Sequence, residues 1–190
     1  MKRLLIVVDY QNDFVDGALG FEGAQTLDEP IARKIDEYRE SGDLVCFTLD
    51  THHKDYLETQ EGRKLPISHC IEGTQGHELY GQVATKVHES DDVFKKPTFG
   101  STALFERLAK QQAIADGLGV PPFESIEVVG LVSNMCVLSN AVIARTACPN
   151  TPIIVDASCT LAPDPEMNEK ALDVLEGLQI EVTNRAPRDA

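Results

Sequence analysis

Five short runs of apolar residues divide the chain and predict the strands of a β-sheet. The runs are continuous rather than alternating, which is typical of parallel strands that helices cover on both faces. They are Leu4–Val8, Leu44–Leu49, Ile126–Val132, Ile153–Val155 and, more weakly, Leu178–Val182.

Segments with helical spacing separate these runs. The first segment carries Leu27, Ile31, Ile35 and Tyr38 and ends at Gly42. The second begins near Ser101, carries Leu104, Leu108 and Ala115 and ends at Gly117. The third opens at Asp164-Pro165, continues through Met167, Ala171 and Leu175 and ends at Gly177. The alternation predicts an open, mostly parallel sheet between helical layers. The length predicts one domain, residues 1–190.

Polar residues close several of the predicted strands. Asp9 follows the first, Asp50 follows the second, and Ser133 to Cys136 follow the Ile126 strand. Ligands of such sheets bind beyond the carboxyl ends of the strands, so this is where we expect a site. The stretch from Thr51 to Val93 lacks clear periodicity, and a loop of that length in a compact domain is usually functional.

Charge and cysteine content narrow the classes of function. The net charge of −14 disfavours binding to nucleic acid or to an anionic membrane. The apolar run after Met1 is too short for a signal peptide or a membrane span. The five cysteines show no CxxC spacing, which fits a reducing compartment. We therefore expect a cytoplasmic protein without nucleic-acid or membrane partners.

Cys136 is the strongest candidate nucleophile. It follows Val132, and Ser133 is expected to cap a helix whose first turn contains the cysteine. Free N–H groups and the positive end of a helix lower the pKa of a thiol and can hold an oxyanion. The alternative is that Cys136 is a small buried apolar residue, as most free cysteines are.

Lys96 and Asp9 could assist such a nucleophile. A lysine ~4 Å from a thiolate would favour the charged sulfur by about 4 kcal/mol at an effective dielectric near 20, and so keep it ionised. Asp9 could move a proton between the thiol and a departing amine. Each has an alternative: Lys96 as a solvated surface residue, and Asp9 as the cap of the next turn, with Asp13 as a competing carboxylate.

Asp50, His52 and His69 offer one carboxylate and two imidazoles. Residues 50 and 52 of an extended segment point the same way, and His69 can approach from across the loop. Three such ligands with open positions describe a catalytic metal site. Unrelated polar residues of a loop are the alternative.

Three segments in this order resemble the isochorismatase-like cysteine hydrolases. Asp9 to Phe14 (DYQNDF) is similar to the D-x-Q-x-D-F opening of that family, and Gly130 to Val137 (GLVSNMCV) is similar to its cysteine segment. Lys96 stands at the place of the family lysine, and the resemblance runs from about Lys2 to Val182. It implies a three-layer α/β/α fold, a homo-oligomer, and Asp9, Lys96 and Cys136 as the catalytic group.

The resemblance also implies finer features of the site. A cis peptide is expected at Leu131–Val132, which would turn the N–H groups of Val132 and Cys136 into an oxyanion hole. The metal residues, together with His69 to Gly76 (HCIEGTQG), are similar to the nicotinamidase branch. The metal expected at Asp50, His52 and His69 is Zn²⁺, although Fe²⁺ or Mn²⁺ would fit the same ligands. Glu58 or Glu61 could add a fourth ligand.

The expected activity is therefore hydrolysis of nicotinamide to nicotinate and ammonia through a thioester on Cys136. Phe14 and Phe99 are candidate walls for the aromatic ring, or else buried core residues. Asn134 departs from the Asp that nicotinamidases often have at that position. Two alternatives stay open: a hydrolase of another small amide or carbamoyl compound, and a non-catalytic binding protein on the same fold.

Overall fold

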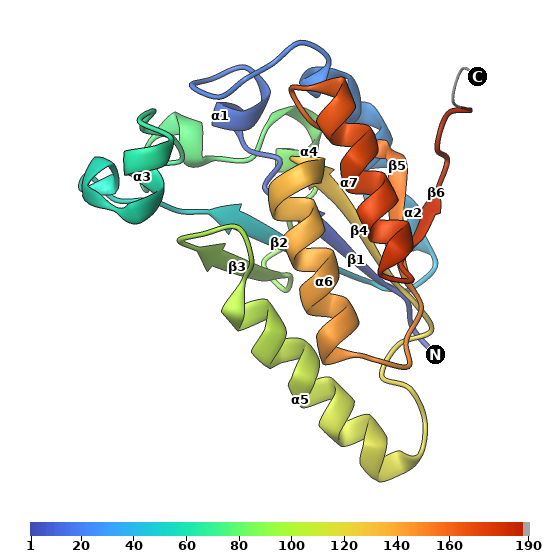
Figure 1. Ribbon diagram of the computed structural model, residues 1–190. Coiled ribbons are helices and arrows are strands. Elements are labelled where there is room, and N and C mark those ends of the chain that lie inside the picture. The colour runs from blue at the N-terminus through green and yellow to red at the C-terminus, as the bar shows by residue number, and fades with distance from the viewer. Residues whose placement is uncertain (188–190) are drawn as a thin grey trace.

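Six parallel strands form the central sheet of the protein, in a computed structural model that describes residues 1–187 (Figure 1). The last three residues of the expected 1–190 domain lie outside this range. The sheet order is β3-β2-β1-β4-β5-β6. The chain adds strands to one side of β1 as far as β3, and then continues with β4 on the other side of β1. The strands are β1 Leu4–Val8, β2 Leu44–Asp50, β3 Asp92–Lys96, β4 Ile126–Leu131, β5 Ile153–Leu161 and β6 Glu181–Thr183.

Burial explains which strands the hydrophobic pattern predicted. Every residue of β1 and β4 is buried, so these strands consist almost entirely of apolar residues. The pattern missed β3, because this strand lies at the sheet edge and only Lys96 of its five residues is buried. The predicted run Ile153–Val155 is the first part of the longer β5, and the weak run at 178–182 is shifted to β6.

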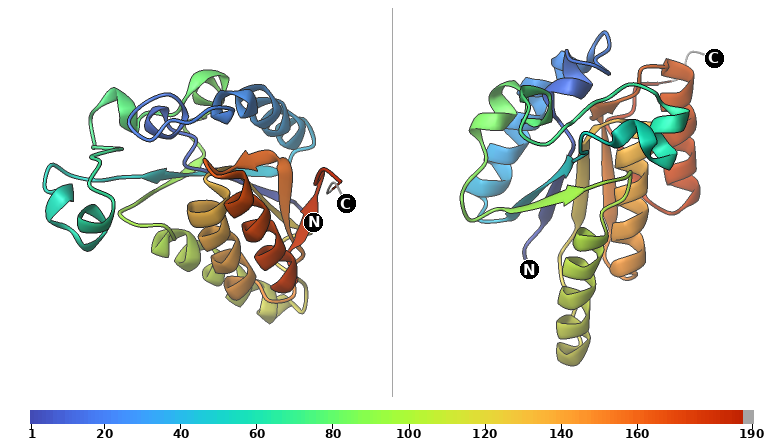
Figure 2. Two further views of the ribbon diagram at one scale, coloured as in Figure 1. Left: turned by 45° about the horizontal axis from the view of Figure 1, so that its top comes forward. Right: turned by 90° about the vertical axis from the view of Figure 1, so that its left-hand side faces the viewer.

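Two helical layers cover the sheet and confirm the three-layer α/β/α fold (Figure 2). Leu4, Ile6 and Val8 of β1 face a core built with α5, α6 and α7, whereas Leu5 and Val7 face a core built with α2 and the short helices. The helices are α1 Asn12–Val15, α2 Asp28–Glu40, α3 Gln60–Lys64, α4 Gly81–Thr85, α5 Thr102–Leu118, α6 Leu138–Ala147 and α7 Pro165–Gly177. Among residues 1–187 no helix is long and apolar enough to cross a membrane.

The helix ends follow the predicted signals with one correction. Asp164 caps α7 by accepting the N–H groups of Glu166 and Met167, and Ser101 caps α5 by accepting the N–H of Leu104. Gly117 does not end α5: the helix continues to Leu118, and Gly119 ends it with a φ of 70°. Glycine adopts this left-handed conformation without steric cost, which makes it the natural terminator.

The long segment between β2 and β3 contains α3, α4 and two 3-10 turns, at 56–58 and 75–77. It is tied to the end of β2 where His52 pairs with Ile71 in an isolated bridge. In Figure 1, α3 lies beyond the carboxyl end of β2, outside both helical layers. The segment therefore places its polar residues beyond the carboxyl ends of the strands, where a site is expected.

Candidate active site

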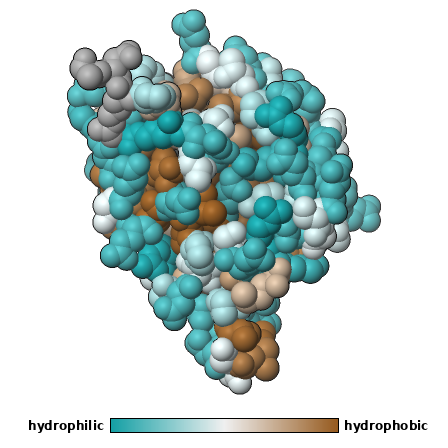
Figure 3. All heavy atoms as spheres, turned by 90° about the vertical axis from the view of Figure 1, so that its right-hand side faces the viewer, coloured by the Kyte–Doolittle hydropathy of each residue, from teal (hydrophilic) through white to brown (hydrophobic). Residues whose placement is uncertain are grey.

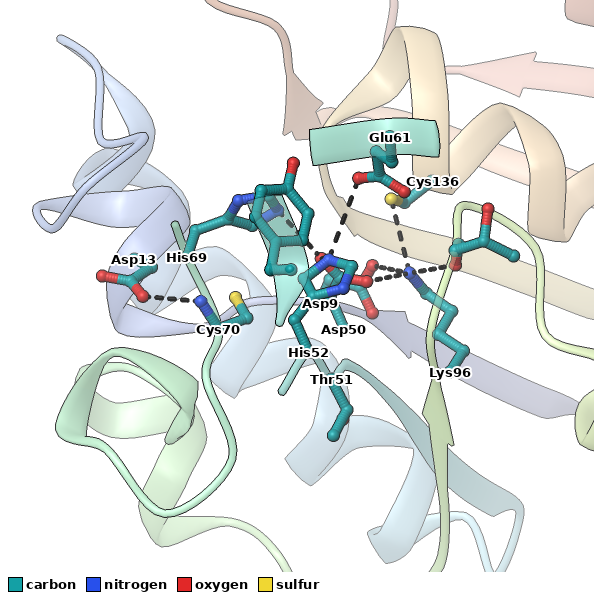
Figure 4. Close-up of polar contacts among 12 residues, drawn as sticks. Asp9, Asp13, Asp50, Thr51, His52, Glu61, His69, Cys70, Lys96 and Cys136 are labelled. Carbon is teal, nitrogen blue, oxygen red and sulfur yellow. Dashed lines mark hydrogen bonds and ion pairs between the residues drawn. The ribbon is translucent and has the colours of Figure 1, made fainter. Parts of the chain in front are cut away.

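Asp9, Lys96 and Cys136 meet at the carboxyl ends of three strands (Figure 4). Asp9 follows β1, Lys96 ends β3, and Cys136 lies in the turn after β4. Lys96 Nζ is 2.6 Å from Asp9 Oδ2 and 3.5 Å from Cys136 Sγ. All three residues are buried, with at most 4% of any one exposed. The structure thus brings together the three residues that the sequence singled out.

Lys96 lies between the two acidic groups of this site. Burial raises the pKa of Asp9, and the Lys96 ammonium opposes that rise. Burial and the nearby Asp9 raise the pKa of the Cys136 thiol, and here too Lys96 opposes. Lys96 Nζ is closer to Asp9 than to the sulfur. That Lys96 holds Cys136 ionised stays a prediction.

Two hydrogen bonds with Thr48 hold Asp9 in place. Thr48 Oγ1 donates to Asp9 Oδ1 at 2.6 Å, and the backbone N–H of Asp9 donates to the Thr48 carbonyl at 3.1 Å. Asp9 has a φ of 46°, a conformation that L side chains rarely adopt. No sequence signal singled out Thr48, because a threonine within an apolar run is also an ordinary strand residue.

Asp13, the competing carboxylate, has a structural position instead. Its Oδ2 accepts the N–H of Cys70 at 2.7 Å and its Oδ1 accepts the N–H of Ala18 at 3.1 Å. These bonds tie the start of the chain to the segment that carries His69. Asp9 is therefore the carboxylate that faces Lys96.

The turn that carries Cys136 differs from the predicted helix start. Residues 133–137 form a π-helical turn, in which Val137 N–H donates to the Val132 carbonyl. The N-terminal cap is Val132, and the buried hydroxyl of Ser133 has no hydrogen-bond partner among the described residues. The expected capping role of Ser133 is thus wrong. The Leu131–Val132 peptide is cis, as the family resemblance implied.

Asp50, His52 and His69 form the one group of three or more His, Cys, Asp or Glu residues among residues 1–187 that could hold a metal ion. Asp50 Oδ2 lies 3.0 Å from His52 Nε2 and 3.3 Å from His69 Nε2. Ligands of a tetrahedral zinc, each about 2.0–2.1 Å from the ion, are about 3.3 Å apart, so the spacing fits a metal of this size. The burial of all three side chains also fits.

The surroundings hold these three side chains in place. His69 Nδ1 lies 2.8 Å from the Ile67 carbonyl, and this contact directs Nε2 toward Asp50. The ring of Tyr56 packs against both imidazoles, with centroids 4.5 Å from His52 and 4.9 Å from His69. Burial opposes ionisation of Asp50, but hydrogen bonds with the two histidines and the charge of Lys96 hold its pKa well below the ordinary range.

The side chain of Gln11 holds the backbone of Asp50 in place. The sequence alone assigned no role to Gln11. Its amide donates to the carbonyls of Asp50 and His77, at 2.9 and 2.8 Å, and accepts the Asp50 N–H at 2.7 Å. The D-x-Q motif contained the signal, but the partners are backbone groups that become neighbours only in the fold.

Glu61 and Glu58, the two candidates for a fourth metal ligand, differ in their burial. Glu61 of α3 is partly buried, and its Oε1 lies 3.8 Å from His52 Nε2. Burial and the negative Asp50 raise the pKa of Glu61. Glu58 is exposed. Glu61 is therefore the carboxylate that a bound metal could recruit.

An open cavity of about 530 Å³ is lined by residues that neighbour Lys96 and Cys136 in the sequence. Its walls include Phe99 and Met135, which neighbours Cys136, and the lining is completed by Thr59, Gln60, Glu61, Lys64, Leu65, Pro97 and Thr98. Phe14 does not line it: this residue is buried and its ring packs against His69 at 5.6 Å. Of the two aromatic walls proposed from sequence, only Phe99 lies at the cavity.

A second cavity, of about 580 Å³, lies at the amino ends of β1 to β3. Four of its charged residues are paired with each other, Arg39 with Asp91 and Arg107 with Asp92, and Asp43 is paired with Arg3. None of the catalytic or metal-site residues lines it. The candidate catalytic and metal-binding residues therefore lie away from this cavity, at the carboxyl ends of the strands.

The chain is similar to known proteins over most of its length. Residues 3–187 match the family described as the isochorismatase domain. An uncharacterized isochorismatase family protein, PncA, of Bacillus subtilis (strain 168) is 31% identical over 153 residues, covering 75% of this chain and 78% of that protein. The nicotinamidase/pyrazinamidase of Mycobacterium tuberculosis (strain ATCC 25618 / H37Rv) is 29% identical, over 85% of this chain and 89% of that protein.

Solved structures show the same fold. The nicotinamidase/pyrazinamidase PncA from Bacillus subtilis superimposes with a TM-score of 0.80 at 28% identity, covering 96% of this chain and 99% of that one. The pyrazinamidase of Pyrococcus horikoshii, in complex with zinc, gives a TM-score of 0.78 at 24% identity, covering 97% and 100%.

Proposed function

The chain belongs to the isochorismatase family, and from this premise we propose that it is a cysteine hydrolase that converts nicotinamide to nicotinate and ammonia. One observation carries the proposal: Lys96 contacts Asp9, Cys136 and Asp50, so the catalytic group and the metal ligands form a single site. The relatives described as nicotinamidase/pyrazinamidase support the choice of substrate.

The first half of the reaction forms a thioester. Cys136 Sγ attacks the carboxamide carbon while its proton passes to Asp9, and the N–H groups of Val132 and Cys136 stabilise the oxyanion. Asp9 then gives the proton to the amide nitrogen, the C–N bond breaks and ammonia leaves.

The second half restores the enzyme. Water attacks the thioester carbon with Asp9 as the general base, the C–S bond breaks, and Asp9 returns the proton to the sulfur. The product leaves as nicotinic acid and becomes nicotinate by releasing its proton to solvent. Lys96 remains charged throughout, because the neighbouring carboxylates raise its pKa against the effect of burial. Its charge stabilises whichever of Asp9 and Cys136 is negative.

Asp50, His52 and His69 would hold a divalent metal, with zinc as the proposed ion and iron or manganese as alternatives. When bound, it would hold the pyridine nitrogen of the substrate and ordered water. Phe99 would form one wall for the ring.

Asn134 favours a second candidate, hydrolysis of another small amide or carbamoyl compound. It lies two residues before Cys136, where nicotinamidases often have Asp. A panel of amides, with nicotinamide among them, separates the two candidates by their relative kcat/KM.

Ammonia release from nicotinamide tests the proposal. The metal-loaded protein should turn over nicotinamide, Cys136→Ala should abolish turnover, and Cys148→Ala, at a buried cysteine behind α6, should retain it. In metal analysis, Asp50→Ala should bind less metal than the parent. A folded, metal-loaded protein with no activity on any amide of the panel would leave the non-catalytic binding protein as the remaining interpretation.

A further inference from the structure

Asn140, in the first turn of α6, connects the nucleophile to the segment that carries Phe99. It is fully buried. Its Nδ2 donates to the Cys136 carbonyl at 2.8 Å and to the Phe99 carbonyl at 3.0 Å, and its Oδ1 accepts the Ser101 N–H at 3.0 Å. Two of the three bonds therefore hold residues 97–101, which we call the wall segment, and the third holds the turn of Cys136.

The chemistry of this position requires an amide. Two carbonyls need donors and one N–H needs an acceptor, and a primary amide supplies both from one planar group. A carboxylate of the same shape would accept from Ser101 but would face the carbonyls of Phe99 and Cys136 without a proton to donate. A leucine of similar size would remove all three hydrogen bonds.

The wall segment depends on such contacts because it has no regular secondary structure. Lys96 Nζ holds the Thr98 carbonyl at 3.0 Å. Gly100 packs so closely on α6 that a Cβ there would lie 2.7 Å from Ile143 Cδ1. Asn140 supplies the remaining anchors, and Phe99, 40% exposed, projects from the segment into the cavity lining.

We propose that Asn140 is a positioning residue that fixes the Phe99 wall relative to Cys136 and thereby sets the fit of the substrate ring. This inference rests on the proposed amidase function. A ring held at the wrong distance from the sulfur binds poorly and reacts slowly.

A double-mutant cycle tests whether Asn140 acts through the wall. Asn140→Ala should raise the KM for nicotinamide and lower kcat/KM about tenfold, as should Phe99→Ala. In the Phe99→Ala background, the further loss on Asn140→Ala should be much smaller, because the wall is already gone. Asn140→Asp, a variant of unchanged size, should behave like Asn140→Ala, and Asn150→Ala, at an exposed asparagine, should match the parent. Equal losses in both backgrounds would overturn the proposal.

Hydrogen exchange gives a measure that does not need turnover. The Ser101 amide, which donates to Asn140 Oδ1, and the other amides of residues 98–101 should exchange faster in Asn140→Ala than in the parent, while the strand β1 keeps its protection. Unchanged exchange in the wall segment would overturn the anchoring role even if activity fell. A parent protein that hydrolyses no amide would contradict the proposed function, and the exchange measurement would still decide whether Asn140 holds the segment.

Discussion

At the scale of single residues, the carboxylate of Asp50 joins the two halves of the site. Its Oδ2 faces His52 and His69, while its Oδ1 lies 3.3 Å from Lys96 Nζ. A cation bound at Asp50 Oδ2 would draw the negative charge of Asp50 away from Lys96. Asp9 and Cys136 would then be the main partners of Lys96. The candidate metal ligands and Cys136 therefore share Lys96 as a common charged neighbour.

The two aspartates of the opening motif should respond differently to the same change. Asp9→Asn removes the only proposed proton carrier, so kcat should fall at least about 100-fold. Asp13→Asn weakens charge-assisted bonds to two backbone N–H groups, so it should lower the free energy of unfolding by about 1–3 kcal/mol and leave kcat nearly unchanged. Ammonia release per folded molecule and urea unfolding measure the two effects. Equal losses of kcat would contradict the assignment of Asp9 as the proton carrier.

Sequence reasoning found the residues with distinctive chemistry and missed their supports. Cys136, Lys96 and Asp50 belong to residue types that carry chemistry at strand ends. Thr48 and Gln11 act through hydrogen bonds to partners 39 residues away along the chain. Such partners are neighbours only after the sheet has formed, so no local pattern identifies them.

At the scale of elements, the approach of β4 to β1 requires a glycine. Val8 of β1 is in register with Gly130 of β4, and Gly130 has a φ of 115°. A Cβ at this position would lie 2.0 Å from the Val8 carbonyl oxygen. The contact places the ends of both strands, and hence Asp9 and the Cys136 turn, side by side.

Gly130→Ala should therefore destabilise the fold by more than about 3 kcal/mol, through steric overlap and backbone strain together. Gly177→Ala provides the matched control, because a Cβ at Gly177 meets no atom within 4 Å. That substitution should change stability by less than about 1 kcal/mol. Urea unfolding compares the two variants, and similar midpoints would argue against a required close approach of β1 and β4.

The elements themselves were predictable where burial was complete. Continuous apolar runs identified β1, β2 and β4, and capping residues identified α7. The pattern failed at β3, whose residues face solvent at the sheet edge, and at the Cys136 turn, where a π-helical geometry replaces the expected cap. Both failures lie at the site, where function rather than packing determines the local sequence.

At the scale of the whole molecule, the candidate site lies at the carboxyl ends of the strands. Acidic residues outnumber basic ones and give the chain its net negative charge. The face in Figure 3 is largely hydrophilic, with apolar residues gathered at its centre and at the lower end, where α5 ends in the view of Figure 1. Leu118 is 72% exposed at this end. The homo-oligomer and the cytoplasmic location expected from the sequence stay predictions.

Away from the site, a charge network between α2 and the sheet should make stability depend on pH. Lys34 Nζ lies 2.7 Å from Glu127 Oε1 and 2.8 Å from Asp156 Oδ2, and Ser158 also donates to Asp156. Burial opposes ionisation of Asp156, but these hydrogen bonds and the Lys34 charge outweigh it and lower its pKa.

Because the folded pKa of Asp156 lies below the unfolded value of about 3.9, its contribution is complete above that pH and is lost as the pH falls through the folded pKa. Asp156→Asn should lower the free energy of unfolding by about 1–3 kcal/mol at pH 7. The gap between parent and variant should stay constant from about pH 5 to 8 and shrink below about pH 4. Urea unfolding across this range measures the gap, with Asp55→Asn as the exposed control. A gap that stays the same down to the acid transition would mean that packing, not ionisation, accounts for the stabilisation by Asp156.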